Sequence, residues 1–300
     1  DCTSPVAMET ESMNLLEISK PWIPENVLDI DACPDSLTTS VYSKDIMVYL
    51  MEKELRDLLL PDFLANSPGV TSRMRAVLMD WLMQVQLFEE LTDETLHLCV
   101  AFIDTFLSLV DVKMSTLQLI GITCLFIASK FNERFAPKIE SLCYLTQDTF
   151  VKEQVLHCER IVLQTLHFNL SRPVSVTFLD RYLQVHHNPT KVEYLARYLL
   201  DLHITSISLA SSPPSLKASS ALYLARFLLL DTAPAWTPDL AYYTNYTVEE
   251  LQDCANELIN LLIKAPDSRY QGARLKYSKE EYMSISYSEQ VKNELMMTKN

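Results

Sequence analysis

Three hundred residues, 48% of them hydrophobic, are enough for one large hydrophobic core or two of ordinary size. Only three residues are glycine, which favours helices over antiparallel hairpins, because the tight turns of hairpins usually need glycine. The formal net charge of −14 argues against nucleic acid as a partner, because contacts to the phosphate backbone need clustered Lys and Arg.

Residues 1–40 mix Pro, Ser, Thr and acidic residues without periodicity, which predicts a largely unstructured lead-in. The chain begins with Asp rather than Met, so we expect further residues upstream. Residues 41–71 form an N-terminal helix, from about Ser40 to Arg56, and a linker. The apolar residues of this helix make a narrow stripe suited to docking on a larger surface: Tyr42, Ile46, Tyr49 and Leu50.

Two blocks of five helical segments follow, over 72–171 and 172–266. The first block is predicted at 72–88, 93–109, 115–131, 137–145 and 149–166, and the second at 174–187, 191–204, 214–230, 238–244 and 247–264. The segments "LQLIGITCLFIASKF" and "LKASSALYLARFLL" are both rich in small residues at their midpoints, which indicates two copies of one five-helix unit. Residues 267–300 turn polar again, and we expect a tail that packs only partly.

No catalytic or cofactor site is predicted. Three glycines cannot form a phosphate-binding loop or a dinucleotide fingerprint. Side chains of the adjacent His186 and His187 diverge on a helix, which argues against metal binding. The seven cysteines include no C-x-x-C pair, as expected for buried reduced thiols. No run approaches the length of a membrane span and no signal-peptide pattern is present, so we expect a soluble intracellular protein that is not an enzyme and does not bind membranes.

Arg75 is the most informative charge of segment 72–88. That segment is apolar nearly all round, as is typical of a helix at the centre of a bundle. A guanidinium held there cannot lose its charge and needs a carboxylate. Asp104 stands at the matching depth of the next long helix, so we expect an Arg75–Asp104 ion pair that joins the two helices.

Two further charges, Lys130 and Glu159, lie on apolar helical stripes. Periodicity alone favours ordinary structural roles. Lys130 would extend to solvent near a helix C-terminus, where the helix dipole favours cations, and Glu159 would have a partner within the chain. The alternative is that both are charged anchors in an apolar protein interface with a wet rim.

Four segments resemble the cyclin box of the mitotic cyclins: "MRAVLMDWLMQV", "FIDTFLS", "LQLIGITCLFIASKF" and "VLHCERIVLQTLHFNL". The segments "WTPDL", "YTVEEL" and "KAP" fit the second repeat of that family. The spacing resembles A-type cyclins most closely, whereas "QVQ" at Gln84 resembles B-type. The resemblance implies an all-α fold of two tandem five-helix cyclin-box domains, preceded by an N-terminal docking helix.

The resemblance also implies a function. In this family the first box binds a cyclin-dependent Ser/Thr protein kinase beside its mobile αC helix and pushes that helix inward, which completes the phosphoryl-transfer site. The expected protein is therefore a non-catalytic regulatory subunit acting in cell-cycle control (S phase, G2 or M). It would be nuclear, with a cytoplasmic pool, and would recruit substrates and inhibitors with Arg-x-Leu motifs.

Site residues follow from matching positions. Lys130 and Glu159 match the charged pair that anchors kinase backbone groups. The other kinase contacts implied are Phe131, Glu133, Leu163, Phe168, Tyr42, Ile46 and Tyr49. The groove implied for Arg-x-Leu motifs consists of Met74, Val77, Leu78, Trp81, Gln84, Leu117 and Gln118. From the sequence alone, Gln118 also fits a capping box with Ser115.

Three positions depart from the family pattern. Asn132 removes a charge, Arg134 places a charge where an apolar contact is expected, and Thr105 replaces a common arginine. These departures keep open a second interpretation, a cyclin-fold adaptor that binds partners without activating a kinase. A third is a cyclin-fold transcription factor that binds DNA or a polymerase, against which the net charge of −14 counts.

Overall fold

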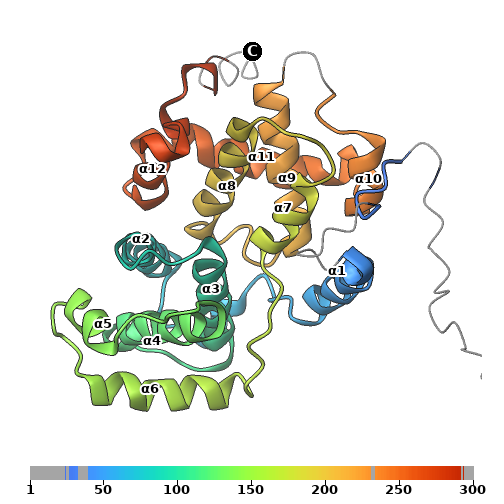
Figure 1. The fold of residues 1–300 in the computed structure, drawn as a ribbon. Helices are drawn as coiled ribbons and strands as arrows, with labels where there is room; N and C mark the ends of the chain where they lie inside the picture. Colours follow the sequence, from blue (N-terminus) through green and yellow to red (C-terminus); the bar gives the residue numbers. More distant parts are fainter. Residues whose placement is uncertain (1–23, 25–26, 33–39, 231–233, 292, 294–300) are drawn as a thin grey trace, which may run out of the picture.

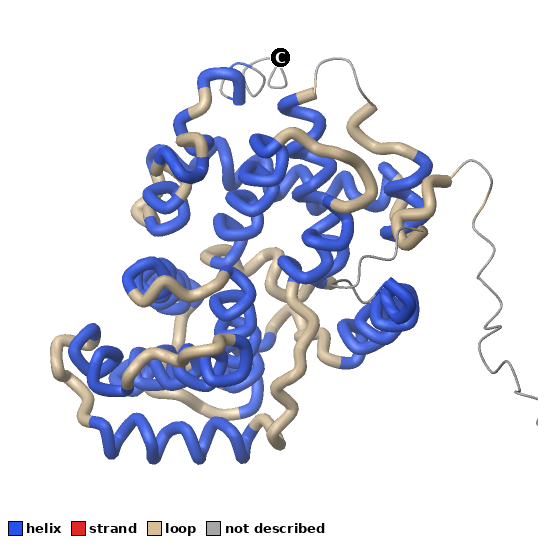
Figure 2. The backbone as a smooth tube through the Cα atoms, viewed as in Figure 1, coloured by secondary structure: helices blue, strands red, loops and turns tan. Residues whose placement is uncertain are grey.

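The regular elements of the chain are all helices. The computed structural model describes residues 24, 27–32, 40–230, 234–291 and 293. Within those residues no strand occurs (Figure 2). The prediction of an all-α protein is confirmed.

The first bundle contains five helices: α2 (Ser72–Phe88), α3 (Asp93–Leu109), α4 (Met114–Asn132), α5 (Ile139–Leu145) and α6 (Lys152–Thr165). Helix α4 is at its centre and packs against the other four. Close packing of α4 on α2 depends on Gly121, where an added Cβ would lie 2.7 Å from Cδ1 of Leu78. A small residue at the midpoint of the central helix therefore lets its neighbour approach, as expected from the sequence.

Helix α4 corrects one expectation from the sequence. It is 19 residues long and its mean hydropathy reaches 1.4, so by length and composition it could cross a membrane. The expectation that no run approaches the length of a span was wrong. Most of the helix is buried against its neighbours, and this central position in a bundle explains its apolar composition.

The second bundle repeats the arrangement with α7 (Ser175–Leu183), α8 (Thr190–Ile204), α9 (Pro214–Leu229), α10 (Pro238–Thr244) and α11 (Val248–Lys264). Helix α9 is central and packs against α7, α8 and α11. The capping box expected at the start of α11 is present, because Thr247 donates its backbone N–H to Glu250 Oε2 at 2.8 Å. The two bundles lie one above the other in Figure 1 and meet where α3 contacts α7.

Helix α1 (Ser40–Arg56) lies beside the junction of the two bundles (Figure 1). Its C-terminal half is fixed to both of them. Glu54 is buried and accepts hydrogen bonds from the backbone N–H of Ser215, at 2.8 Å, and from the Ser215 hydroxyl. Lys53 Nζ donates to Asn169 Oδ1 at 3.2 Å. These contacts orient α1 without covering its N-terminal half.

The segment before α1 was expected to be largely unstructured. Most of it, residues 1–23, 25–26 and 33–39, lies outside the described residues. Residues 27–32, however, pack on the second bundle. The backbone N–H of Leu28 donates to Asp239 Oδ1 at 2.9 Å, and Asp31 forms a bidentate ion pair with Arg181. For this short part the expectation was wrong, because its partners lie 150 and 211 residues away in the sequence.

The polar segment after residue 266 is also more ordered than predicted. Helix α12 (Gly272–Lys276) packs on α2 and α8, so it bridges the two bundles. Lys276 and Tyr277 are fully buried, and the backbone N–H of Gly272 donates to Asp80 Oδ1 at 2.7 Å. Through residue 291 this segment is therefore part of the fold, not a partly packed tail.

Candidate functional site

Lys130 and Glu159 form an ion pair on the surface of the first bundle. Lys130 belongs to the last turn of α4 and Glu159 to the middle of α6, and the two helices pack side by side (Figure 1). Lys130 Nζ also lies 4.1 Å from the ring centroid of Phe126. The side chains are 41% and 12% exposed, respectively. An ammonium has three donors and a carboxylate several acceptor sites, so a partner could still bind to both groups.

Large apolar side chains follow Lys130 and Glu159 along the chain. Phe131 is 50% exposed and Phe168 is 66% exposed, while Leu163 is half-buried. His167 and Phe168 both have positive φ, of 49° and 56°, a conformation that is costly for residues other than glycine. Both residues lie just after α6, and Phe168 is exposed there. The name Lys130–Glu159 patch is used below for Lys130, Phe131, Glu159, Leu163 and Phe168.

Three of the four residues of the predicted α1 stripe remain open to solvent, whereas Leu50 is half-buried against the core. Tyr42, Ile46 and Tyr49 are 62%, 42% and 53% exposed. The hydrogen bond from Lys53 to Asn169 brings α1 to the residue next to Phe168. The α1 stripe therefore belongs to a helix anchored at the edge of the Lys130–Glu159 patch, and the two form neighbouring apolar surfaces.

Glu133 has a role that the sequence did not predict. Its Oε1 accepts hydrogen bonds from the backbone N–H of Thr92 at 2.9 Å and from the hydroxyls of Thr92 at 2.9 Å and Thr95 at 2.6 Å. Burial alone would raise the pKa of Glu133, but these hydrogen bonds outweigh it and lower the pKa. The carboxylate thus caps the N-terminus of α3, where negative charge is favourable.

Two of the three residues that depart from the family pattern, Asn132 and Arg134, follow Lys130 and Phe131 directly, whereas Thr105 is buried in α3 and donates its hydroxyl to the carbonyl of Ala101 at 2.8 Å. The guanidinium of Arg134 lies 5.3 Å from the ring centroid of Phe135, and both side chains are exposed. Asn132 is half-buried, and its Nδ2 has no hydrogen-bond partner within the described residues. A partner at this surface would therefore meet a positive charge on an aromatic ring next to Lys130.

The predicted groove residues lie where α2 and α4 pack together, a surface named here the α2–α4 face. Leu78 and Leu117 are each only 5% exposed and form its floor, whereas Val77 is 52% exposed. Met74, Trp81 and Gln118 are half-buried and Gln84 is exposed. Val77 and Leu78 are adjacent and both apolar, yet Val77 is exposed and Leu78 is buried. Helical periodicity alone could not predict this difference in exposure.

The capping box predicted at Ser115 and Gln118 is wrong. Helix α4 begins at Met114, its N-cap residue is Lys113, and no side chain caps it. Ser115 is therefore already inside the first turn, where its hydroxyl cannot act as the N-cap acceptor. Gln118 has no capping role and remains on the α2–α4 face.

The α2–α4 face receives no free negative charge from α2. Asp80 is the only acidic residue of that helix. Its carboxylate accepts the Gly272 N–H on the side that faces α12, and burial raises its pKa. Phe88, four residues after Gln84, is 63% exposed and extends the helix surface with another apolar side chain, which the sequence analysis did not single out.

Arg75 and Asp104 lie inside, away from these surfaces. They are 2% and 3% exposed, and Arg75 Nε and Nη2 each donate to Asp104 at 2.6 Å. Arg75 Nη1 also donates to the carbonyl of Ile204 at 2.8 Å. Because Ile204 ends α8, the pair joins the bundles as well as the two helices.

No metal centre emerges from the part of the chain that is described, where no group of three or more His, Cys, Asp or Glu side chains is placed to hold an ion. His186 and His187 lie just after α7, not on a helix as expected, and His186 Nε2 lies 2.7 Å from Oγ1 of Thr237, the N-cap residue of α10. The surfaces described above are suited to binding proteins by apolar and charged contacts.

Comparison with known proteins identifies the family of this chain. The family model for the cyclin N-terminal domain matches residues 45–171, and that for the cyclin C-terminal domain matches residues 173–291. Cyclin-A3-3 of Arabidopsis thaliana is 37% identical over 86% of this chain and 82% of its own length. The G2/mitotic-specific cyclin-B of Hydra vulgaris is 34% identical over 90% of this chain and 74% of its own length. Both A-type and B-type cyclins are thus similar to it.

Solved structures agree on the fold. A viral cyclin from herpesvirus saimiri superposes with a TM-score of 0.64 over 72% of this chain and 97% of that chain, at 19% identity. The yeast RNA Pol II CTD kinase CTDK-1 complex gives a TM-score of 0.55 at 15% identity, over 65% of this chain and 67% of the matched chain. The chain spans about half the length of some relatives, 53% for Cyclin-A1-1 of Oryza sativa subsp. japonica. With both domain models matched and relatives above 30% identity over most of its length, the chain belongs to the cyclin family.

Proposed function

We propose that this cyclin binds and activates a cyclin-dependent Ser/Thr protein kinase in cell-cycle control, as a regulatory subunit without catalytic groups of its own. The observation that supports this most directly is the Lys130–Glu159 patch. An ion pair close in sequence to the exposed Phe131 and Phe168 resembles part of a protein interface, where aromatic anchors contribute much of the binding energy and charged pairs add specificity. The neighbouring α1 stripe would extend the same interface.

The physical role of such a subunit is to bind one arrangement of the kinase better than another. A cyclin that contacts the αC helix only in its inward position shifts the kinase population toward that position by the difference in binding free energy. Lys130 can donate to backbone carbonyls and Glu159 can accept from backbone N–H groups. A kinase helix that lies across the patch would satisfy both contacts together.

The test is phosphorylation of a histone-type substrate by purified cyclin-dependent kinases, alone and with this chain. In the variant Lys130→Ala/Glu159→Ala, we expect kinase affinity to fall by about 30-fold or more, since central anchors typically contribute about 2 kcal/mol or more. Activation should be lost in parallel. The control is Lys279→Ala/Glu281→Ala, which removes an exposed ion pair of 3.5 Å remote from the patch and should leave activation unchanged.

Other outcomes would change the proposal. If the double variant activates as well as the unsubstituted chain, the patch is not the kinase interface. If the unsubstituted chain binds a kinase without activating it, the protein is an adaptor, for which Arg134 and its exposed charge supply a reason. No binding to any such kinase would refute the proposed function.

We also propose that the α2–α4 face docks Arg-x-Leu motifs chiefly through the leucine. The face combines a buried apolar floor with the exposed Val77, while the one carboxylate of α2, on Asp80, is bound to Gly272. Replacing leucine by alanine in a test peptide should weaken binding by about tenfold or more, the scale of burying a leucine side chain. Replacing arginine by glutamine should cost less than about fivefold, as for an exposed ion pair.

A gain-of-function variant makes the docking prediction specific. Gln84 is exposed on α2, where its Nε2 donates to Asp80 Oδ2 at 3.4 Å. Gln84→Glu would replace this donor with a carboxylate, which repulsion from Asp80 directs toward solvent and toward a bound cation. We expect this variant to bind the arginine peptide more tightly than the unsubstituted chain does, with the gain lost at high salt. Fluorescence polarisation of labelled peptides measures both effects. A large loss on replacing arginine in the unsubstituted chain would show that another element supplies a carboxylate.

A further inference from the structure

Residues 27–32, named here the docked segment, are held by helices α7 and α10 of the second bundle. The hydroxyl of Tyr243 on α10 binds the main chain twice, accepting from the N–H of Ile30 at 3.2 Å and donating to the carbonyl of Leu28 at 2.8 Å. Asp239, in the first turn of α10, accepts the N–H of Leu28 at 2.9 Å. The Ile30 side chain is half-buried against the core. The segment is therefore bound through its main chain as well as through side chains.

An ion pair fixes the end of the docked segment. Arg181 on α7 donates to both carboxylate oxygens of Asp31, at 2.8 and 2.5 Å. The two side chains are 12% and 24% exposed, and the guanidinium lies 5.7 Å from the ring centroid of Tyr243. Bidentate, partly buried pairs of this kind are stronger than the exposed ion pairs of a protein surface. The docked segment thus connects α7 to α10.

Helix α10 leads directly to residues that hold α1. Its C-cap residue, Asn245, donates Nδ2 to Sδ of Met51 on α1 at 3.6 Å. The hydroxyl of the next residue, Tyr246, lies 2.9 Å from Oγ of Ser215, and that hydroxyl itself donates to Glu54 on α1. The docked segment lies beside α10, with α1 below both of them in Figure 1. One continuous set of contacts therefore runs from the docked segment through α10 to α1.

Helix α10 is too short to be stable by itself. It has seven residues, whereas isolated helices shorter than about 12–15 residues are marginal in water. Its position therefore depends on its contacts, and the docked segment supplies those at Asp239 and Tyr243. The docked segment is also the nearest described part of the chain before α1. It thus acts on α1 in two ways, through α10 and along the chain.

The N-terminal half of α1 is the part of that helix that needs such support. The hydrogen-bonded anchors of the helix, Lys53 and Glu54, are near its C-terminus. Tyr42, Ile46 and Tyr49 are exposed. A helix end with few buried contacts opens more readily than the rest of a fold, so its order depends on the elements next to it.

We propose that the docked segment orders the N-terminal half of α1 and thereby presents the α1 stripe to a kinase, with Asp31, Arg181 and Tyr243 as positioning residues. A helix that is already ordered loses less conformational entropy on binding. The segment would therefore raise kinase affinity indirectly. The ordering of α1 is independent of the proposed function, whereas the effect on kinase affinity rests on it.

Amide hydrogen exchange in the full chain, without a kinase, tests the ordering. The first four N–H groups of a helix have no partner within it, so the informative amides are those of residues 44–50. Asp31→Asn and Tyr243→Phe weaken the docked segment through different contacts. In both we expect these amides to exchange about three- to tenfold faster, the scale of one hydrogen bond.

The chain offers a matched control for each variant. Asp29→Asn removes the same charge from the same segment, and asparagine keeps the acceptor that Asp29 offers to the N–H of Asp31 at 3.0 Å. Tyr242→Phe removes the same hydroxyl from the neighbouring position of α10. Both controls should leave the exchange of residues 44–50 unchanged.

Kinase affinity, measured by surface plasmon resonance, gives the second readout. We expect Asp31→Asn and Tyr243→Phe to lower it by about three- to tenfold, because apparent affinity falls with the fraction of chains in the binding-competent arrangement. Arg181→Gln should behave as Asp31→Asn does. Combining these two substitutions should cost no more than either alone, since both remove the same ion pair.

Several results would overturn the inference. Unchanged exchange of residues 44–50 in both Asp31→Asn and Tyr243→Phe would mean that the docked segment does not order α1. Faster exchange over the whole second bundle would mean that these side chains maintain the domain rather than α1. Faster exchange confined to α1, with kinase affinity unchanged, would remove the α1 stripe from the kinase contact. If the unsubstituted chain binds no kinase, the proposed function fails, and the exchange experiment still decides whether the segment orders α1.

Discussion

Replacing Arg75 with alanine is expected to lower the free energy of unfolding by about 3–5 kcal/mol, the usual effect of removing one member of a buried ion pair. Arg75 is 2% exposed and makes three hydrogen bonds, two to Asp104 and one to the carbonyl of Ile204. Its removal leaves the Asp104 carboxylate buried without a cation. It also breaks one of the polar contacts between the two bundles.

Urea unfolding of Arg75→Ala measures this effect, with Arg73→Ala as the control. Arg73 is exposed on the same helix and its removal should change stability by less than about 0.5 kcal/mol. A further variant, Arg75→Met/Asp104→Leu, should recover much of the loss, because apolar pairs often replace buried ion pairs without cost. A loss in Arg75→Ala below about 1 kcal/mol, the ceiling for exposed pairs, would show that the pair is open to solvent.

Helix positions were largely predictable from the sequence because helix ends are set locally. The predicted bounds of α2, 72–88, are those observed. The Thr71 side chain accepts the N–H of Met74 at 3.2 Å, a contact between residues three apart. The start of α3 shows the limit. There the backbone N–H of Thr92 donates to Glu133, which lies about forty residues later in the chain. No local sequence pattern predicts such a partner.

The candidate site was predictable in part. Charges on apolar stripes singled out Lys130 and Glu159, but two interpretations remained open at that stage, a partner within the chain or a contact with another protein. The structure shows the internal ion pair and the exposure of the surrounding aromatics together. Periodicity could not give this result, because the exposure of a side chain depends on how neighbouring helices are packed.

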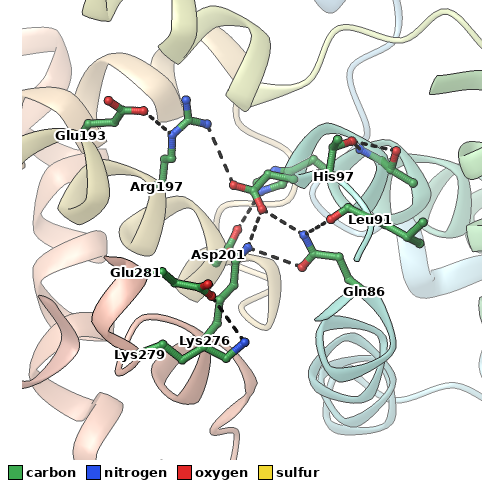
Figure 3. A network of polar contacts seen from close by, with 12 residues as sticks. Gln86, Leu91, His97, Glu193, Arg197, Asp201, Lys276, Lys279 and Glu281 are labelled. Atoms are coloured by element: carbon green, nitrogen blue, oxygen red, sulfur yellow. Dashed lines mark hydrogen bonds and ion pairs between the residues drawn. The ribbon is translucent and has the colours of Figure 1, made fainter. Parts of the chain in front are cut away.

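The segment after residue 266 shows why polar composition misleads. Its charges suggested a solvated tail, yet Lys276 is among the most buried side chains of the molecule. The reason is that its partners come from three other elements. Lys276 Nζ donates to Asp93 Oδ1 at 2.5 Å, to Asp201 Oδ2 at 2.6 Å and to Gln86 Oε1 at 3.4 Å (Figure 3). Long-range charge pairing of this kind is invisible in a single sequence.

The network around Lys276 connects both bundles to the C-terminal segment. Gln86 and Asp93 come from the first bundle and Asp201 from the second, while His97 Nε2 lies 3.1 Å from Asp201 Oδ1 (Figure 3). Burial alone would raise the pKa of Asp201, but Lys276 and His97 hold it far below its ordinary value. Burial alone would lower the pKa of Lys276, but Asp201 and Asp93 raise it well above its ordinary value.

These opposite pKa shifts define the pH range over which the network stabilises the fold. The contribution of Asp201 is fully present above the unfolded carboxyl pKa of about 3.9 and is lost as the pH falls through the lower folded value. The contribution of Lys276 is fully present below the unfolded pKa of about 10.4 and is lost as the pH rises through the higher folded value. Between about pH 5 and 9 both contributions are therefore complete.

Lys276→Met is accordingly expected to lower the free energy of unfolding at neutral pH by about 3–5 kcal/mol, because Asp201, only 1% exposed, loses its ammonium partner and, among the described residues, Asp93 keeps only Arg197 as a cation, at 4.0 Å. Methionine keeps the length of the stem, so the loss reports the charge. Lys279→Met is the matched control and should have little effect, since that lysine is half exposed and, among the described residues, its one ion pair is with Glu281 at 3.5 Å (Figure 3).

The pH dependence separates a charge effect from a packing effect. In Lys276→Met, Asp201 has lost its ammonium partner and should take up a proton more readily. The difference in free energy of unfolding between the variant and the unsubstituted chain should therefore shrink as the pH is lowered from 7 toward about 4. Urea unfolding at several pH values measures the difference between variant and unsubstituted chain. A gap that stays constant over this range would mean that the lost stability comes from packing of the lysine stem. A gap that narrows on acidification would establish that a charge from the polar C-terminal segment holds the two cyclin domains together.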